Sequence, residues 1–249
     1  MKNGKISIVG LGPGNLLDLS PRARAAIEAA EIIAGYKTYI NLIPELVEGK
    51  KIIATEMMQE IERAELAIEQ SRKNFSVAVI SSGDAGIYGM AGLVIEKILE
   101  LPENLQPEFE VVPGISAVNS AAAILGAPLM HDFAVISLSD LLTDWELIKK
   151  RVECAAAGDF VIALYNPKSK KRVKNIEEVQ EILLKFKNKN TPVGIVTNAG
   201  RDGEKKIIST LEKFAAEEIN MFSLVLIGNS KTFVKNNFMI TPRGYENKI

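Results

Sequence analysis

The chain has 249 residues and a nearly balanced charge, with 30 Lys and Arg against 31 Asp and Glu. Hydrophobic residues make up 47%, so the chain is long and apolar enough for one large domain or two smaller ones. The net charge of −1 excludes a general attraction to nucleic acid or to an acidic membrane, so an anionic substrate has to be met by local basic residues.

The chain contains few cysteine and histidine residues, which bears on disulfides and metal sites. The one cysteine, Cys154, excludes an intramolecular disulfide, and the one histidine, His131, argues against a metal site. The chain enters its first apolar run without a signal-type stretch. Residues 111–130 carry no charge, but prolines and glycines interrupt them, so we interpret them as a strand end, a turn and a buried helix. We therefore expect a cytoplasmic protein with no membrane segment.

Short apolar runs alternate with helical patterns in the first half, which favours a parallel sheet covered by helices. We expect strands at 5–10, near Ile32, at 51–55, 76–81 and 109–112, and helices at 21–30, 58–72, 89–100 and 117–125. Ser20-Pro21 is a good helix start, with serine as the N-cap and proline at the first helical position.

The second half begins after Gly126-Ala127-Pro128, and its pattern is different. We expect strands at 133–137, 160–165, 193–197, 206–210, 223–227 and 238–240, with one helix that opens at 143–146 and runs to about 157 and another near 175–187. Thr143 to Glu146 match a capping box at the start of the first of these helices. Several strands follow one another without a helix, which predicts a mixed sheet. We divide the chain into two α/β domains, 1–120 and 121–249.

Two glycine-bearing loops follow strands and are candidates for a ligand site. Gly10 to Gly14 resemble the start of a dinucleotide fingerprint, but Asn15 replaces a glycine and Pro13 lacks an amide donor for phosphate. Gly83-Asp84 offer a close backbone approach and one carboxylate acceptor. Both loops lie at strand exits, where open α/β sheets bind ligands. Plain turns with a solvated Asp84 are the alternative.

Basic residues follow three further strand exits. Lys168 and Arg172 come after Tyr165-Asn166-Pro167, Arg201 after the strand at 193–197, and Arg243 after Thr241-Pro242. Such cations fit a substrate with several carboxylates, and a solvated charged face is the alternative.

Two further motifs leave alternatives open. Pro113 to Ser116 form either a simple helix start or a set of amides that face a ligand. His131-Asp132 is either an orienting pair or a plain loop.

Taken together, these motifs resemble the tetrapyrrole methyltransferases, the S-adenosylmethionine enzymes of cobalamin and sirohaem synthesis, over essentially the whole chain. Within that family the chain is most similar to enzymes that methylate C-17 of precorrin-3B or of cobalt-factor III. The stretches that carry this similarity are 82–90, 125–133, 136–143 and 239–245. Ala85 stands where most of the family has proline, a departure typical of this subgroup, and Asp144 stands where proline is common.

The resemblance implies two α/β domains of the class III methyltransferase type, with the active-site cleft between them, and a homodimer. It implies C-17 methylation coupled to ring contraction, with S-adenosyl-L-methionine as donor. It places the donor among Leu11, Gly83, Asp84, Ile87, Ser116, Ala117, Tyr165, Ala199 and Pro242. We expect the tetrapyrrole substrate to meet Pro13, Lys168, Arg172, Arg201 and Arg243. His131 and Asp132 are the pair that we nominate for proton transfer in ring contraction.

Three alternatives remain at this stage. One is another tetrapyrrole methyltransferase of the same pathway. A nicotinamide-dependent oxidoreductase is weakened by the imperfect fingerprint and by the missing ribose carboxylate. A non-catalytic tetrapyrrole-binding module is the third. Binding of S-adenosylmethionine separates the methyltransferases from the other two classes.

Overall fold

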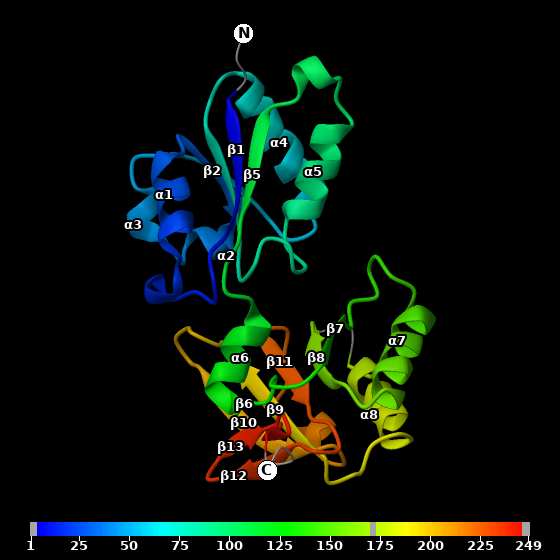
Figure 1. Ribbon diagram of the computed structural model, residues 1–249. Coiled ribbons are helices and arrows are strands. Elements are labelled where there is room, and N and C mark those ends of the chain that lie inside the picture. Colours follow the sequence, from blue (N-terminus) through cyan, green and yellow to red (C-terminus); the bar gives the residue numbers. More distant parts are fainter. Residues whose placement is uncertain (1–3, 170–172, 246–249) are drawn as a thin grey trace. The chain divides into compact units, whose positions relative to one another are not determined.

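The structure, a computed structural model, describes residues 4–169 and 173–245. The chain divides into two compact units, Met1–Ala117 and Val118–Ile249, each of α/β type (Figure 1). The two units divide after Ala117, the first residue of α6 (Ala117–Leu125). The domain limit that we predict, after residue 120, lies within the same helix.

The first unit is built on a five-stranded parallel sheet with the order β3-β2-β4-β1-β5. Its strands are β1 (Lys5–Gly10), β2 (Ile32–Tyr36), β3 (Lys51–Thr55), β4 (Val77–Ser81) and β5 (Glu108–Val112). After β1 the chain moves toward one edge of the sheet, and after β4 it moves to the other. The neighbouring exits of β4 and β1 are therefore a topological switch point, where α/β sheets bind ligands.

Helices cover both faces of this sheet, as the alternating pattern predicts. They are α1 (Pro21–Ala29), α2 (Lys37–Ile40), α3 (Pro44–Val47), α4 (Glu60–Arg72) and α5 (Ala91–Leu99), with short 3-10 turns η1 (Leu16–Asp18) and η2 (Glu103–Leu105). In Figure 1, α1 and α3 lie on one face and α4 and α5 on the other, and each face has its own buried core. The Ser20 hydroxyl accepts the Ala23 amide at 3.1 Å, so the predicted cap of α1 is confirmed.

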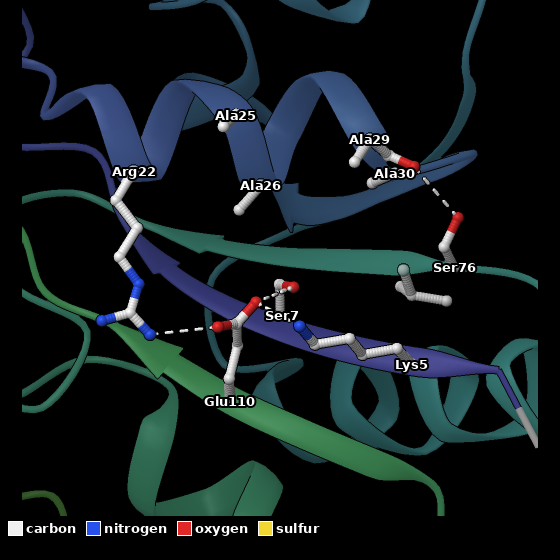
Figure 2. A pocket seen from close by; sticks show the side chains of 10 residues that line it. Lys5, Ser7, Arg22, Ala25, Ala26, Ala29, Ala30, Ser76 and Glu110 are labelled. Carbon is white, nitrogen blue, oxygen red and sulfur yellow. Dashed lines mark hydrogen bonds and ion pairs between the residues drawn. The ribbon is translucent and has the colours of Figure 1, made fainter.

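A cavity of about 290 Å³ lies beside α1, between its alanines and the strands below (Figure 2). Glu110 forms ion pairs there with Lys5 at 2.6 Å and Arg22 at 3.0 Å, and it accepts the Ser7 hydroxyl at 3.1 Å. Lys5, then Arg22, hold the pKa of Glu110 at about 2, below its ordinary 4.5. These contacts tie α1 to the edge strand β5, away from the strand exits.

The second unit contains a five-stranded sheet with the order β10-β9-β11-β8-β7. The sheet is mixed, as predicted. Its strands are β7 (Phe133–Ser137), β8 (Val161–Tyr165), β9 (Pro192–Thr197), β10 (Lys205–Thr210) and β11 (Ser223–Ile227). β8 and β9 both run antiparallel to β11, and β7 is parallel to β8, so β7, β8 and β9 end at the same edge. The loops that follow β7, β8 and β9 all lie at this edge.

The remaining elements of this unit flank that sheet. They are α7 (Trp145–Ala157), α8 (Asn175–Leu184), the 3-10 turn η3 (Phe214–Ala216), and a small sheet of β12 (Phe233–Lys235), β13 (Phe238–Ile240) and β6 (Gly126–Ala127). A core cluster lies between the large sheet and α7 and α8.

The structure corrects several predicted boundaries. Asp144, rather than Thr143, caps α7, because its carboxylate accepts the Glu146 amide at 2.8 Å. Helix α4 begins at Glu60 rather than at residue 58, since Met58 has a φ of 69° and cannot continue a helix. The short elements α2, α3, β6 and β12 were absent from the prediction, because two to four residues carry too little periodicity to be detected.

Candidate functional site

Three strand exits of the first unit meet at the switch point. The loops after β1 and β4 form a small antiparallel bridge, in which the Gly12 amide donates to the Gly83 carbonyl at 3.0 Å and the Gly83 amide donates to Gly12 at 2.7 Å. Gly12 and Gly83 have φ values of 76° and 68°, a region that glycine adopts without strain. The loop after β5 joins them through Gly114.

Glycine is required where these loops touch. A Cβ on Gly114 would lie 2.2 Å from the Gly83 carbonyl oxygen, and one on Gly10 would lie 2.7 Å from the same oxygen. Both contacts are with backbone, which cannot rotate away. The three loops therefore pack main chain against main chain, and their glycines set the shape of this edge.

Asp84 fastens two of these loops together. One carboxylate oxygen accepts the Gly86 amide at 2.8 Å, and the other accepts the Gly114 amide at 3.0 Å. Each carboxylate oxygen has room for a second hydrogen bond, so acceptor capacity remains for a ligand hydroxyl or amine. The Asp84 carboxylate is therefore tied to the backbone of two loops, and its role toward a ligand stays a prediction.

Seven residues that we predict for the site lie in these three loops or, for the last, at the first residue of α6: Leu11, Pro13, Gly83, Asp84, Ile87, Ser116 and Ala117. A Cβ on Gly83 would lie 3.6 Å from the Ala117 amide nitrogen and 3.8 Å from the Ser116 Cα, so the β4 and β5 loops are in close contact. Leu11 and Ser116 are buried, whereas Ile87 is exposed and offers an apolar surface to a ligand. The edge combines hydrogen-bonding groups with an apolar wall.

Arg63 of α4 is a component of this edge that the sequence analysis missed. Its side chain is only 3% exposed, and it takes part in no ion pair among the described residues. The guanidinium donates to the Thr55 hydroxyl at 2.7 Å, to the Glu56 carbonyl at 3.1 Å and to the Met90 sulfur at 3.5 Å. Burial lowers the pKa of Arg63. It links the loop after β3 to the end of the loop after β4.

Tyr165 and its neighbours order the strand exits of the second unit. The Tyr165 hydroxyl accepts the Val118 amide at 3.0 Å, near the start of α6, and its carbonyl accepts the Leu138 amide at 2.9 Å. The Asn166 amide group donates to the Ser137 hydroxyl at 2.9 Å. Asn166 and Asn198, the residues after β8 and β9, both have positive φ, which asparagine tolerates well. The exits of β7 and β8 thus form one ordered surface.

Of the basic residues that we predict for the substrate, the structure describes Lys168, after β8, and Arg201, after β9, at this edge. The Arg201 amide donates to the Asn198 carbonyl at 2.9 Å, which closes a turn that also contains Ala199. The Gly200 amide donates to the Glu204 carboxylate at 2.8 Å and fixes the same loop. Arg172 lies outside the described residues.

Two predicted pairs lie elsewhere in the second unit. His131 and Asp132 precede β7, at the amino end of the strand whose carboxyl end lies beside Tyr165. The His131 Nδ1 accepts the Asp132 amide at 2.9 Å, and both side chains are exposed. Pro242 and the exposed Arg243 follow Thr241, whose amide donates to Ala127, the residue that ends β6 just after α6.

The structure therefore does not bring either pair to Tyr165. The Tyr165 hydroxyl accepts the Val118 amide near the start of α6, and this helix rises by roughly 13 Å over its length to Leu125. The five residues of β7 separate His131 and Asp132 from the strand exits by a similar distance, roughly 16 Å. The roles that we assign to these four residues stay predictions.

Among residues 4–169 and 173–245, no group of three His, Cys, Asp or Glu side chains could hold a metal ion. The same residues contain no helix with the length and apolarity that crossing a bilayer requires.

A family model described as Tetrapyrrole (Corrin/Porphyrin) Methylases matches residues 5–215, which include the sheet of the first unit and the strands from β6 to β10 of the second. The chain belongs to this family. A tetrapyrrole methylase fold accounts for the two α/β units and for the glycine loops after β1 and β4.

Curated relatives refine the placement within the tetrapyrrole methylases. The cobalt-factor III methyltransferase of Priestia megaterium is 51% identical over 98% of this chain, which spans 46% of that protein. A probable cobalt-factor III C(17)-methyltransferase of Salmonella typhimurium is 48% identical over 96% of this chain and 99% of its own length.

Solved structures agree with this placement. The methyltransferase CobJ is 35% identical, with a TM-score of 0.91 over 96% of this chain and all of that chain. A uroporphyrin-III C-methyl transferase from Thermus thermophilus, complexed with S-adenyl homocysteine, has a TM-score of 0.67 at 19% identity over 90% of this chain and 92% of its own, a likeness of fold alone.

Proposed function

We propose that this tetrapyrrole methylase transfers a methyl group from S-adenosylmethionine to C-17 of a corrinoid precursor, cobalt-factor III or precorrin-3B, and couples the transfer to ring contraction. The observation that carries the proposal is the set of three glycine-lined loops at the switch point, held together through Asp84. Two relatives that match nearly all of this chain are named as a cobalt-factor III methyltransferase and a probable cobalt-factor III C(17)-methyltransferase, which supports the proposal.

The donor site that we propose is the carboxyl edge of the first unit. S-adenosylmethionine carries hydroxyl and amino donors together with a flat adenine, and it needs both acceptors and an apolar surface. The spare acceptor capacity of Asp84 and the exposed side chain of Ile87 supply these two features. The residues therefore fit this donor.

When bound, the donor supplies an electrophilic methyl group, which would be transferred to the attacking carbon in an in-line displacement that releases S-adenosylhomocysteine. The work left to the chain is alignment, because positioning alone is worth roughly 7–11 kcal/mol in well-oriented reactions. Rigid loops suit this task, since a displacement of about 1 Å can cost two orders of magnitude in rate. The bridge between Gly12 and Gly83 and the two amide bonds to Asp84 supply that rigidity.

We assign the carboxylates of the substrate to Lys168 and Arg201, whose loops follow β8 and β9, together with Arg172 and Arg243. Arginine and lysine bind carboxylates through charge-assisted hydrogen bonds. Ring contraction needs proton movement at carbon and oxygen, for which we retain His131 and Asp132 as a hypothesis. Tyr165, Ala199 and Pro242 remain our proposed donor contacts in the second unit.

Two further proposals concern the state of the protein in the cell. We propose a homodimer, as the family resemblance implies, and a cytoplasmic location, which suits a chain with one cysteine. Size-exclusion chromatography with light scattering tests the first, and cell fractionation tests the second.

A panel of thermal shifts tests the donor assignment. S-adenosylmethionine, S-adenosylhomocysteine, NAD and NADP are each added at about 100 times the expected dissociation constant, where one bound ligand adds about 2.7 kcal/mol. We expect a higher melting temperature with the two S-adenosyl compounds only. A shift with a nicotinamide nucleotide instead would support the oxidoreductase, and no shift with any of the four would favour a non-catalytic binding module.

A further inference from the structure

The loop between β3 and α4 holds two methionines in solvent at the same edge of the first sheet as the glycine loops. Met57 is 48% exposed and Met58 is 77% exposed. Met58 has a φ of 69°, which is unfavourable for any residue with a Cβ. An exposed apolar side chain on a strained backbone persists only where the surrounding structure holds it.

Several contacts hold this loop in place. The Gln59 side chain accepts the Glu56 amide at 2.7 Å, and the Glu60 carboxylate accepts the Met58 amide at 3.2 Å. Buried Arg63 donates to the Glu56 carbonyl at 3.1 Å. The conformation is therefore specified on both sides of the methionines, which are presented to solvent by a fixed loop.

Arg63 also connects this loop to the donor loop. Its guanidinium reaches the sulfur of Met90, whose amide in turn donates to the Ser81 hydroxyl at the end of β4. Only β2 separates β3 from β4, so the exits of these two strands lie about 10 Å apart. One buried side chain thus fixes the methionine loop relative to the loop that carries Gly83 and Asp84.

We propose that Met57 and Met58 form a contact surface for the flat face of the tetrapyrrole, and that Arg63 is the residue that positions this surface. The inference rests on the function proposed above. Methionine is unbranched and polarizable, which suits contact with an extended conjugated ring. A second copy of the chain could also cover an apolar loop, but the anchor shared with Met90 ties these methionines to the donor loop.

The replacement Met58→Gly gives a sharp test, because it removes the side chain and relieves the strained φ together. We expect a higher melting temperature, unchanged affinity for S-adenosylhomocysteine, and a KM for cobalt-factor III raised about tenfold. Met58→Leu keeps an apolar side chain and should have a KM close to that of the wild type. The matched control is Asn237→Gly in the β12–β13 turn, where φ is 62° and no substrate contact is proposed. It should leave KM unchanged.

Three results would overturn the inference, and they are distinguishable from one another. An unchanged KM in Met58→Gly, with an active wild type, would show that the methionine does not meet the substrate. Loss of an oligomer in that variant, measured by sedimentation velocity, would assign the loop to a second copy of the chain. A wild type that binds S-adenosylhomocysteine but neither binds nor methylates cobalt-factor III would refute the proposed function, and this contact with it.

Discussion

The replacement Gly114→Ala tests whether the three strand exits really depend on close packing of their backbones. The new Cβ would lie 2.2 Å from the Gly83 carbonyl oxygen and 2.7 Å from the Gly10 carbonyl, so the loops have to separate by about 1 Å. Overpacking of this kind costs about 1–3 kcal/mol, and loss of one hydrogen bond between Gly12 and Gly83 adds about 1 kcal/mol. We therefore expect the free energy of unfolding to fall by about 3 kcal/mol.

Calorimetry and titration with S-adenosylhomocysteine measure the two consequences. A loss of about 3 kcal/mol corresponds to a melting temperature lower by roughly 6–12 °C in a chain of this size, and the displaced loops should bind the ligand at least tenfold more weakly. Gly92→Ala is the matched control, because nothing lies within 4 Å of its Cβ in α5. It should be as stable as the wild type or more stable. A Gly114→Ala protein with normal stability and affinity would refute the packing argument.

Four further results follow from the structure. Asp84→Ala should weaken S-adenosylhomocysteine binding more than tenfold, about 1.4 kcal/mol by titration calorimetry, and unchanged affinity would remove Asp84 from the site. Arg63→Lys keeps the positive charge but loses the planar guanidinium and its three hydrogen bonds, so chemical denaturation should show a free energy of unfolding lower by about 2 kcal/mol. A denaturation midpoint equal to that of the wild type would contradict a stabilising role for these hydrogen bonds. The pKa of Glu110 is lowered first by Lys5, so the contribution of Glu110 to the free energy of unfolding is present above pH 4.5 and is lost as the pH falls toward 2. Glu110→Gln should therefore reduce the fall in melting temperature between pH 4.5 and 2. Parallel curves of melting temperature against pH for the variant and the wild type would argue against the ion cluster. We expect His131→Ala to block ring contraction, and full formation of the contracted product, followed by mass spectrometry and absorbance, would exclude a role for His131.

Much of the first unit could be predicted because its signals are local. Alternating patterns indicate the strands and helices, and glycines at two strand exits indicate the switch point, since parallel strands bring their exits to one edge. The second hydrogen bond of Asp84, to Gly114, was beyond prediction, because it joins loops that are 30 residues apart in sequence. The same limit hid the cap that Tyr165 provides for α6.

Arg63 and His131 illustrate two other limits of prediction from sequence. Arginine in an amphipathic helix usually faces solvent, and nothing in the sequence indicates that Thr55, Glu56 and Met90 surround Arg63. His131 precedes β7 and Tyr165 ends β8, and because these two strands are parallel the residues lie at opposite edges of the sheet. The sequence predicted a mixed sheet and therefore left the relative direction of these strands open.

The most direct test of the central claim is a single-turnover reaction with S-adenosylmethionine carrying a ¹³C-labelled methyl group and cobalt-factor III as substrate. The account predicts that the label appears at C-17 of a ring-contracted product in the carbon NMR spectrum, with S-adenosylhomocysteine formed in equal amount. Label at another carbon would assign the chain to a different step among the tetrapyrrole methylases. Recovery of both reactants unchanged, although S-adenosylhomocysteine binds, would contradict the proposed substrate.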